Sequence, residues 1–161
     1  MVVKGKIEDK VEIKSSAQEF HDVFNGKPHH LANITPEKMH GFTLHSGELG
    51  SSGSIVEFHY THEGVKKFTK LHIEVDDGKH RVDYKIIGGN FSEEYSNFHT
   101  IYDAIPNPDG EGAVVHWIFE YEKPDENTPD PTSLLEYLCG VSKDIDAHIQ
   151  EEAAAAAAAT N

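Results

Sequence analysis

The sequence is poor in cysteine and in long hydrophobic segments. Its 161 residues include one cysteine, Cys139, so no disulfide can form within the chain. No apolar run reaches the roughly 20 residues of a membrane-spanning helix, and residues 1–6 contain no apolar stretch of the secretory type. We therefore predict a cytoplasmic protein without membrane insertion, in which Cys139 is a small buried or half-buried side chain.

Positive charge is also scarce. The chain has 14 Lys and Arg against 28 Asp and Glu, which gives a formal net charge of −14. Nucleic acids and anionic membrane surfaces are bound by clusters of Lys and Arg that face phosphate groups. The composition therefore argues against both partners. The length suits one domain with a sizeable core, and we expect a monomer or a weak dimer.

The motifs of common metal and hydrolase sites are missing. The 12 histidines are scattered, without a His-x-x-x-His or paired Cys/His spacing, so we predict no bound metal and no cofactor. Ser51, Ser52 and Ser54 lie in or next to a Gly-rich loop, residues 47–53, that lacks the Gly-x-Ser-x-Gly pattern of hydrolases. The loop also lacks the terminal Lys of phosphate-binding loops. We predict a plain mobile loop that, with the last helix, gates an interior site.

Alternation of apolar and polar residues is the dominant pattern, and it predicts strands with one buried face. In residues 3–13, for example, Val11 and Ile13 share one face, while Lys10 and Glu12 share the other. Similar patterns cover residues 39–46, 54–61, 65–75, 80–87, 96–105 and 113–122. Short turns join the later strands, which favours antiparallel neighbours.

Two short helices are predicted after the first strand. Residues 16–19, Ser-Ala-Gln-Glu, match a capping box, so a helix should begin at Ala17 and run to about Phe24. Asn25 and the Gly-Lys-Pro that follows it should end this helix. Residues 29–35 can form a second short helix before Pro36.

The longest helical pattern covers residues 130–152. Asp130 can cap the first free amides, and Pro131 suits the first helical position. Apolar residues then recur at steps of three and four: Leu134, Leu138, Val141, Ile145 and Ile149. We predict a single domain over residues 1–152. The Ala-rich tail, residues 153–161, has no apolar stripe to bury and should be frayed or disordered.

These elements predict an α+β fold in which the long helix crosses the concave face of a curved antiparallel sheet. Large aromatic side chains crowd the inward faces. They can fill a dry core, as in most domains, or surround an apolar cavity with a few polar groups, which is how small-molecule sites are lined. The polar groups would be the hydroxyls of Tyr60, Tyr84, Tyr102 and Thr100. The pattern alone leaves both alternatives open.

A family resemblance covers residues 2–152. It is carried by residues 50–55 (GSSGSI), 94–98 (EYSNF), 117–123 (WIFEYEK), 128–131 (TPDP) and 141–148 (VSKDIDAH). Together these resemble the plant major latex protein-like family, a branch of the birch-pollen-allergen and START-like superfamily. The resemblance implies a helix-grip fold: a seven-stranded sheet around the long helix, two short helices and a large internal cavity. It also implies binding or carriage of small hydrophobic plant metabolites, linked to defence or specialised metabolism.

With the cavity favoured by the resemblance, we predict ligand contacts at inward-facing positions of the strands and the long helix. These are Val56, Phe58, Tyr60, Leu71, Val82, Tyr84, Ile86, Phe98, Thr100, Tyr102, Trp117, Phe119, Leu138, Val141 and Ile145.

The resemblance also implies an enzymatic alternative. Norcoclaurine synthase, a relative of the family, joins an amine to an aldehyde, but the position resembling its catalytic Asp is Thr100 here, which has no carboxylate. Other relatives are cyclases or isomerases that steer a reactive terpenoid or alkaloid intermediate to one product. Such activity would need a titratable group in the cavity, and the candidates are Tyr84, Tyr102, His21, His30 and His148. A third alternative is a storage or stress protein whose pocket is incidental.

Overall fold

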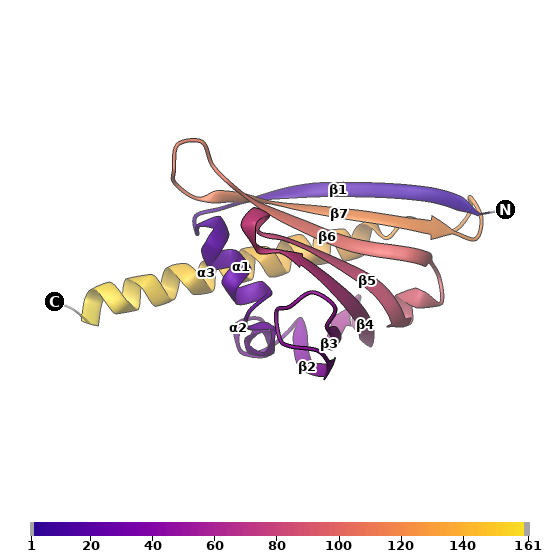
Figure 1. The fold of residues 1–161 in the computed structure, drawn as a ribbon, viewed down its shortest axis with the longest axis horizontal. Helices are drawn as coiled ribbons and strands as arrows, with labels where there is room; N and C mark the ends of the chain where they lie inside the picture. Colours follow the sequence, from indigo (N-terminus) through magenta and orange to yellow (C-terminus); the bar gives the residue numbers. More distant parts are fainter. Residues whose placement is uncertain (1, 160–161) are drawn as a thin grey trace.

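The structure is a computed structural model of the chain and describes residues 2–159. Seven strands form one antiparallel sheet with the spatial order β1-β7-β6-β5-β4-β3-β2 (Figure 1). The strands are β1 (Val3–Ile13), β2 (Met39–Ser46), β3 (Ile55–His62), β4 (Val65–Asp76), β5 (Arg81–Gly89), β6 (Ser96–Pro106) and β7 (Ala113–Lys123). From β2 to β7 each strand pairs with the next one in the chain, and β1 pairs with β7.

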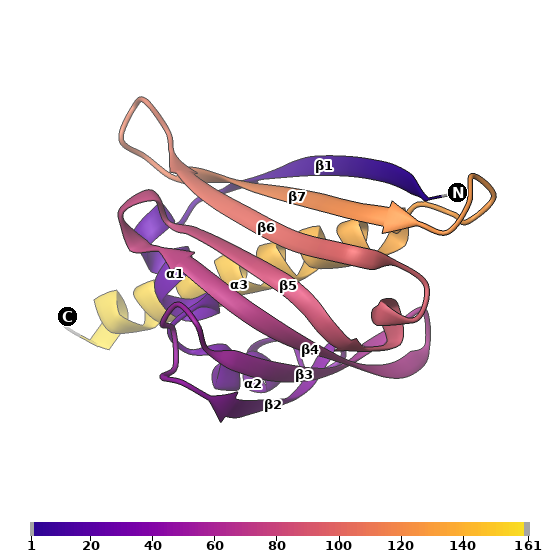
Figure 2. The same cartoon turned by 45° about the vertical axis from the view of Figure 1, so that its right-hand side comes forward.

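Helices cover the concave side of this sheet. α1 (Ala17–Phe24), the 3-10 turn η1 (Pro28–His30) and α2 (Leu31–Ile34) follow β1, and α3 (Thr132–Ala159) follows β7. α3 runs along the inner side of the curved sheet, and α1 and α2 lie toward one end of it (Figures 1 and 2). Two further 3-10 turns, η2 (Asp77–Lys79) and η3 (Asn90–Ser92), flank β5. The predicted α+β helix-grip architecture is confirmed.

The start of α1 forms as its sequence predicts. The hydroxyl of Ser16 accepts a hydrogen bond from the backbone N–H of Glu19 at 3.0 Å, and the Glu19 carboxylate accepts one from the N–H of Ser16 at 2.9 Å. This reciprocal capping box satisfies two amides that have no partner within the helix. It fixes the direction of α1, which buries Phe20, His21 and Phe24 against the sheet.

The start of α3 differs from the prediction. The helix begins at Thr132, and the side chain of Asp130 points to other partners. Its carboxylate accepts a hydrogen bond from the hydroxyl of Tyr121 at 2.6 Å and pairs with the ammonium of Lys123 at 3.2 Å. These two groups come from the end of β7 and lower the pKa of Asp130, the Tyr121 hydrogen bond most strongly. Asp130 therefore ties the connector to the sheet.

The end of α3 also differs. The helix continues without a break to Ala159, past residue 152, where we expected fraying. Alanine has the highest intrinsic helix propensity, so a tail of this composition can extend a helix that packing has already nucleated. Its residues 153–159 are exposed. Residues 160 and 161 of the predicted tail lie outside the described residues.

Polar contacts fix α3 over the sheet. The carboxylate of Asp144 accepts hydrogen bonds from Thr35 at 2.9 Å and Lys38 at 2.7 Å. The carboxylate of Asp146 accepts from the hydroxyl of Ser15 at 2.6 Å. On the inner face, the indole N–H of Trp117 donates to the hydroxyl of Ser142 at 2.8 Å. The helix is therefore held to the segment after α2, to the turn before α1 and to β7 by groups far apart in the sequence.

Candidate functional site

An internal cavity, here called the main cavity, lies between α3 and the inner face of the sheet. Its wall is formed by Phe24, Met39, Phe58, Tyr60, Thr69, Leu71, Tyr84, Ile86, Phe91, Thr100, Trp117, Leu134, Tyr137 and Leu138. The space open to the centres of water molecules is about 70 Å³. With the space that opens to solvent included, the volume is about 560 Å³.

This cavity is smaller than the resemblance implied, because aromatic rings occupy one end of the interior. The ring of Phe24 on α1 lies 5.4 Å from that of Tyr102, 5.5 Å from that of Trp117 and 6.0 Å from that of Tyr84. These edge-to-face contacts are a favourable arrangement for aromatic side chains. α1 therefore closes the interior at this end and leaves the main cavity on the far side of Phe24.

The predicted contact residues divide into three groups. Eight line the main cavity: Phe58, Tyr60, Leu71, Tyr84, Ile86, Thr100, Trp117 and Leu138. Val56 lines a smaller side cavity, next to Phe58 and Tyr84. The remaining six do not line either cavity and are packed in the core: Val82, Phe98, Tyr102, Phe119, Val141 and Ile145. We therefore do not propose these six as ligand contacts.

Six residues of the main cavity wall were missing from the sequence prediction. They are Phe24, Met39, Thr69, Phe91, Leu134 and Tyr137. Thr69 lies two residues before Leu71 on the same strand face, and Leu134 and Tyr137 belong to the apolar side of α3, so the periodicity could have identified these three. Phe91 lies in η3, outside any periodic segment, and its position had no signal in the sequence.

The wall is mainly apolar, and hydroxyl groups supply most of its polar atoms. The hydroxyls of Tyr60 and Thr69 are hydrogen-bonded to each other, and the hydroxyl of Tyr137 donates to the backbone carbonyl oxygen of Lys38 at 2.7 Å. The hydroxyl of Thr100 has no hydrogen-bond partner within residues 2–159. Among the described residues, no Asp, Glu, His, Lys, Arg or Cys lines the main cavity.

The tyrosine hydroxyls of the wall hold their protons at neutral pH. Burial raises the pKa of Tyr60 to about 12, against a small opposing effect of the hydrogen bond to Thr69. Burial also raises the pKa values of Tyr84 and Tyr137 well above the ordinary value for tyrosine. These groups can donate and accept hydrogen bonds, but they cannot serve as bases near pH 7.

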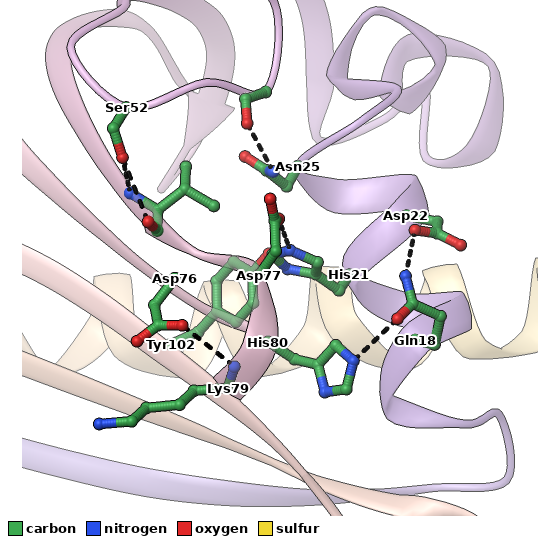
Figure 3. Close-up of polar contacts among 12 residues, drawn as sticks. Gln18, His21, Asp22, Asn25, Ser52, Asp76, Asp77, Lys79, His80 and Tyr102 are labelled. Atoms are coloured by element: carbon green, nitrogen blue, oxygen red, sulfur yellow. Dashed lines mark hydrogen bonds and ion pairs between the residues drawn. The ribbon is translucent and has the colours of Figure 1, made fainter.

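Asp77, His21 and Tyr102 form a chain of side-chain contacts from the surface into the core (Figure 3). The imidazole of His21, whose side chain is 4% exposed, has its Nδ1 atom 2.8 Å from the hydroxyl oxygen of Tyr102. Its Nε2 atom is 2.8 Å from a carboxylate oxygen of Asp77, in η2 at the surface. The ring of Tyr102 lies 6.2 Å from that of Tyr84. We call Asp77, His21 and Tyr102 the polar chain.

The other two candidate histidines lie elsewhere. His30 is exposed and packs against the ring of His29 at 4.3 Å. His148 pairs with Glu152 one turn later on α3, at 3.1 Å. Neither residue lines the main cavity. Of the three histidines only His21 is buried, and it contacts Tyr102, which does not line the main cavity.

A Ser–His contact at the first turn of α3 was not predicted by any motif in the sequence. The Nε2 atom of buried His62 lies 2.7 Å from the hydroxyl of Ser133, and its Nδ1 atom lies 2.9 Å from the ammonium of Lys67. An ammonium group can only donate, so Nδ1 accepts and Nε2 carries the proton. His62 therefore donates to Ser133, which in turn donates to the carboxylate of Glu63. Since His62 cannot take the proton of Ser133, this pair is not an activated nucleophile.

The Gly-rich loop is attached to the sheet rather than free. The hydroxyl of Ser52 accepts from the N–H of Val75 at 2.7 Å and donates to its carbonyl oxygen at 3.1 Å. The amide of Asn25 donates to the carbonyl oxygen of Gly50 at 3.1 Å. Leu49 and Gly50 line the side cavity and not the main cavity. A gating role for this loop would therefore concern the side cavity.

Within residues 2–159, no group of three or more His, Cys, Asp or Glu side chains is placed to hold a metal ion. None of the helices described is both long enough and apolar enough to span a membrane.

The chain is similar in sequence to known plant proteins. The family model of the pathogenesis-related protein Bet v 1 family matches residues 2–152. MLP-like protein 31 of Arabidopsis thaliana is 42% identical over 149 residues, which are 92% of this chain and 87% of the relative. MLP-like protein 28 of the same plant is also 42% identical over 92% of this chain, but the chain spans only 44% of its length.

A solved structure agrees with these sequence matches. The crystal structure of ginseng major latex-like protein 151 from Panax ginseng is 36% identical in sequence and superposes with a TM-score of 0.84, over 90% of this chain and 97% of the ginseng chain. The fold of this family binds small hydrophobic ligands. The chain is therefore a member of the Bet v 1 family, on its major latex protein-like branch.

Proposed function

We propose that the protein binds or carries a small hydrophobic plant metabolite in its main cavity. The observation that carries this proposal is the composition of the wall: apolar and aromatic side chains with a few hydroxyls and no charged group among the described residues. Such a wall suits a ligand that is mostly apolar and has one or two polar atoms. The family name refers to pathogenesis, which supports a role in defence or specialised metabolism.

Burial of apolar surface would supply most of the affinity. A ligand that buries about 200 Å² of apolar surface gains roughly 5 kcal/mol at 25 cal/mol per Å², before the entropic costs of binding. The small space open to the centres of water molecules, about 70 Å³, favours a compact ligand or outward movement of wall side chains. Leu134, Tyr137 and Leu138 belong to one side of α3, so a small shift of this helix would enlarge the cavity.

The chemistry of the wall argues against the enzymatic alternative. A cyclase or isomerase that transfers protons needs a base within hydrogen-bond reach of its substrate. The described wall offers only tyrosine and threonine hydroxyls, and burial raises the pKa of each of the three tyrosines. A cyclase that works through pocket shape alone remains the alternative. It would differ from a carrier by releasing a changed product.

The first test is native mass spectrometry of the protein purified from its natural tissue, followed by organic extraction of the bound material. One stoichiometric apolar metabolite is the expected result. An empty cavity together with turnover of a reactive pathway intermediate would favour the cyclase. A mixture of unrelated lipids at low occupancy would instead favour a storage or stress protein with an incidental pocket.

Paired substitutions on β7 test which face of the sheet binds. Trp117 lines the main cavity, whereas His116 is the neighbouring residue on the opposite face. Trp117→Ala should weaken binding of the extracted ligand by tenfold or more, and His116→Ala by less than about twofold. Tyr84→Ala should behave like Trp117→Ala. Isothermal titration calorimetry measures all three, and equal effects at Trp117 and His116 would contradict the assignment.

A further inference from the structure

The side cavity has a buried hydrogen-bond acceptor that has no partner in the protein. Asn25 is the residue at the C-terminal end of α1, is 7% exposed and lines this cavity. Its amide oxygen, Oδ1, has no hydrogen-bond partner within residues 2–159. Buried polar atoms are nearly always hydrogen-bonded, because leaving one unpaired costs free energy. An unpaired acceptor at a cavity wall therefore indicates a site for a donor group from outside the chain.

The Gly-rich loop fixes the orientation of this amide. The Nδ2 atom of Asn25 donates to the backbone carbonyl oxygen of Gly50 at 3.1 Å (Figure 3). A carbonyl oxygen can only accept, so the nitrogen of the amide, and not its oxygen, must face it. Gly50 has a φ of +77°, and a Cβ atom there would lie 3.3 Å from the backbone oxygen of Asn25, so glycine suits this close approach. Oδ1 is therefore the arm of the amide that is left for a ligand.

The side cavity adjoins the main cavity. Phe24, Phe58 and Tyr84 line both, so the two spaces lie on either side of the same aromatic rings. Apart from Asn25 and the hydroxyl of Tyr84, the side chains around the side cavity are apolar. A molecule held in the main cavity would reach Asn25 by extending one slender arm past these rings.

The size of the side cavity limits what can reach Asn25. The space open to the centres of water molecules is about 10 Å³, against about 70 Å³ in the main cavity. This space admits one group of the size of a water molecule or a hydroxyl, and no ring. A water molecule here would have few polar partners besides Oδ1, and a water with few hydrogen bonds is displaced at little cost. A hydroxyl or N–H group of a ligand can therefore take this position and gain the hydrogen bond to Oδ1.

We propose that Asn25 is a specificity-determining residue, whose Oδ1 atom accepts a hydrogen bond from a ligand that lies in the main cavity and extends a hydroxyl or N–H group into the side cavity. This inference rests on the proposed binding function and specifies its ligand class: an apolar body with a donor group on a slender arm. A molecule whose only polar atom is a carbonyl or ether oxygen would place one acceptor against another, so the site disfavours it.

Three probes of equal size test the ligand class. Hydrocinnamyl alcohol has a hydroxyl, its isomer phenethyl methyl ether has only an acceptor oxygen, and butylbenzene has neither. Trp117 is the single tryptophan and lines the main cavity, so its fluorescence reports binding of all three. We define the selectivity as the Kd of the ether divided by the Kd of the alcohol. Hydration of the free probes affects this ratio equally in every variant, so a change in the ratio isolates the contact within the protein.

Asn25→Leu removes the acceptor and keeps a side chain of similar size. It should lower the selectivity about threefold to tenfold, the range for one hydrogen bond, through weaker binding of the alcohol. Binding of butylbenzene should be unchanged or tighter. Asn33→Leu is the matched control, because Asn33 is exposed on α2 and lines neither cavity. It should leave the selectivity within about twofold of the wild type.

A crystal structure of the wild type with hydrocinnamyl alcohol gives a readout that does not depend on a variant. We expect the hydroxyl oxygen about 2.7–2.8 Å from Oδ1 of Asn25, and a hydroxyl bound elsewhere would overturn the inference. Equal selectivity in the wild type and Asn25→Leu, with all three probes bound, would overturn the role of Asn25 and leave the carrier function intact. A tissue ligand without an O–H or N–H group would do the same. Failure of every probe to bind, with no ligand extracted from tissue, would overturn both.

Discussion

Two buried histidines stand at opposite ends of the interior and differ in their second partner. His21 on α1 and His62 at the end of β3 are 3% and 5% exposed, and each has both ring nitrogens within hydrogen-bond distance of another side chain. His21 has a carboxylate at one nitrogen, whereas His62 has an ammonium. A carboxylate only accepts, so Nε2 of His21 carries a proton. An ammonium only donates, so Nδ1 of His62 has the lone pair.

The two histidines differ in the hydrogen bonds that their neighbours can make. The neighbours of His21 are a carboxylate and a hydroxyl, and the oxygen atoms of both can accept a hydrogen bond from the ring. The neighbour of His62 at Nδ1 is Lys67, which has no lone pair. Burial, and after it the charge of Lys67, lowers the pKa of His62. Lys67 therefore holds His62 in one hydrogen-bond arrangement, in which His62 joins α3 to the β3–β4 turn.

The largest expected effect is on stability when each histidine is removed. His21→Ala leaves the fully buried hydroxyl of Tyr102 without its acceptor and opens a void under α1, and should lower the free energy of unfolding by about 2–4 kcal/mol. His62→Ala should cost about 1–2 kcal/mol, because its partners Lys67 and Ser133 are only half-buried and can turn to water. Urea unfolding measures both. A larger loss of unfolding free energy in His62→Ala than in His21→Ala would contradict this expectation.

The second effect concerns pH. Unfolded His62 binds a proton near pH 6.5, whereas the folded protein resists protonation because the pKa of His62 is lowered. The unfolded state then holds more protons, so the free energy of unfolding falls as pH drops below about 6.5, and the loss levels off below the folded pKa. Lys67→Met removes one cause of the lowered pKa and should reduce this loss by up to about 1 kcal/mol.

The measurement is a series of urea unfolding curves between pH 8 and pH 5. Lys66→Met is the matched control, since Lys66 is exposed and its ammonium does not contact His62 within the described chain. Identical pH profiles for wild type and Lys67→Met would show that Lys67 does not determine the protonation of His62.

The sequence predicted the elements better than it predicted the contacts between them. The capping box at Ser16 and the bounds of β1 depend on neighbours within a few residues, and both formed as expected. The partners of His21 lie 56 and 81 residues away, so no local pattern could join them. The helix start failed for the same reason, because the local signal at Asp130 was overridden by Tyr121 across the connector.

The candidate site shows a second limit of periodicity. Alternation assigned both Tyr84 and Tyr102 to the inner face, and both are buried there. It could not tell which one borders empty space, because that depends on what covers each ring. Phe20 and Phe24 of α1 pack on Tyr102 at 5.5 and 5.4 Å, which removes it from the wall of the cavity. A strand pattern gives the direction of a side chain, and the packing of other elements gives its depth.

The smallest expected effect on stability is that of removing the Ser133 hydroxyl, which contacts His62. Ser133 accepts from His62 and lies in the first turn of α3, so its hydroxyl joins the helix to the β3–β4 turn. Ser133→Ala should lower the free energy of unfolding by about 0.5–1 kcal/mol, the usual net value of one hydrogen bond. Thr132→Ala, one residue earlier and exposed, should change it by less than about 0.5 kcal/mol. Equal losses would mean that the link contributes no more than an ordinary position in the first turn. A loss at Ser133 that exceeds the loss at Thr132 would show that the hydrogen bond to His62 itself joins the helix to the β3–β4 turn.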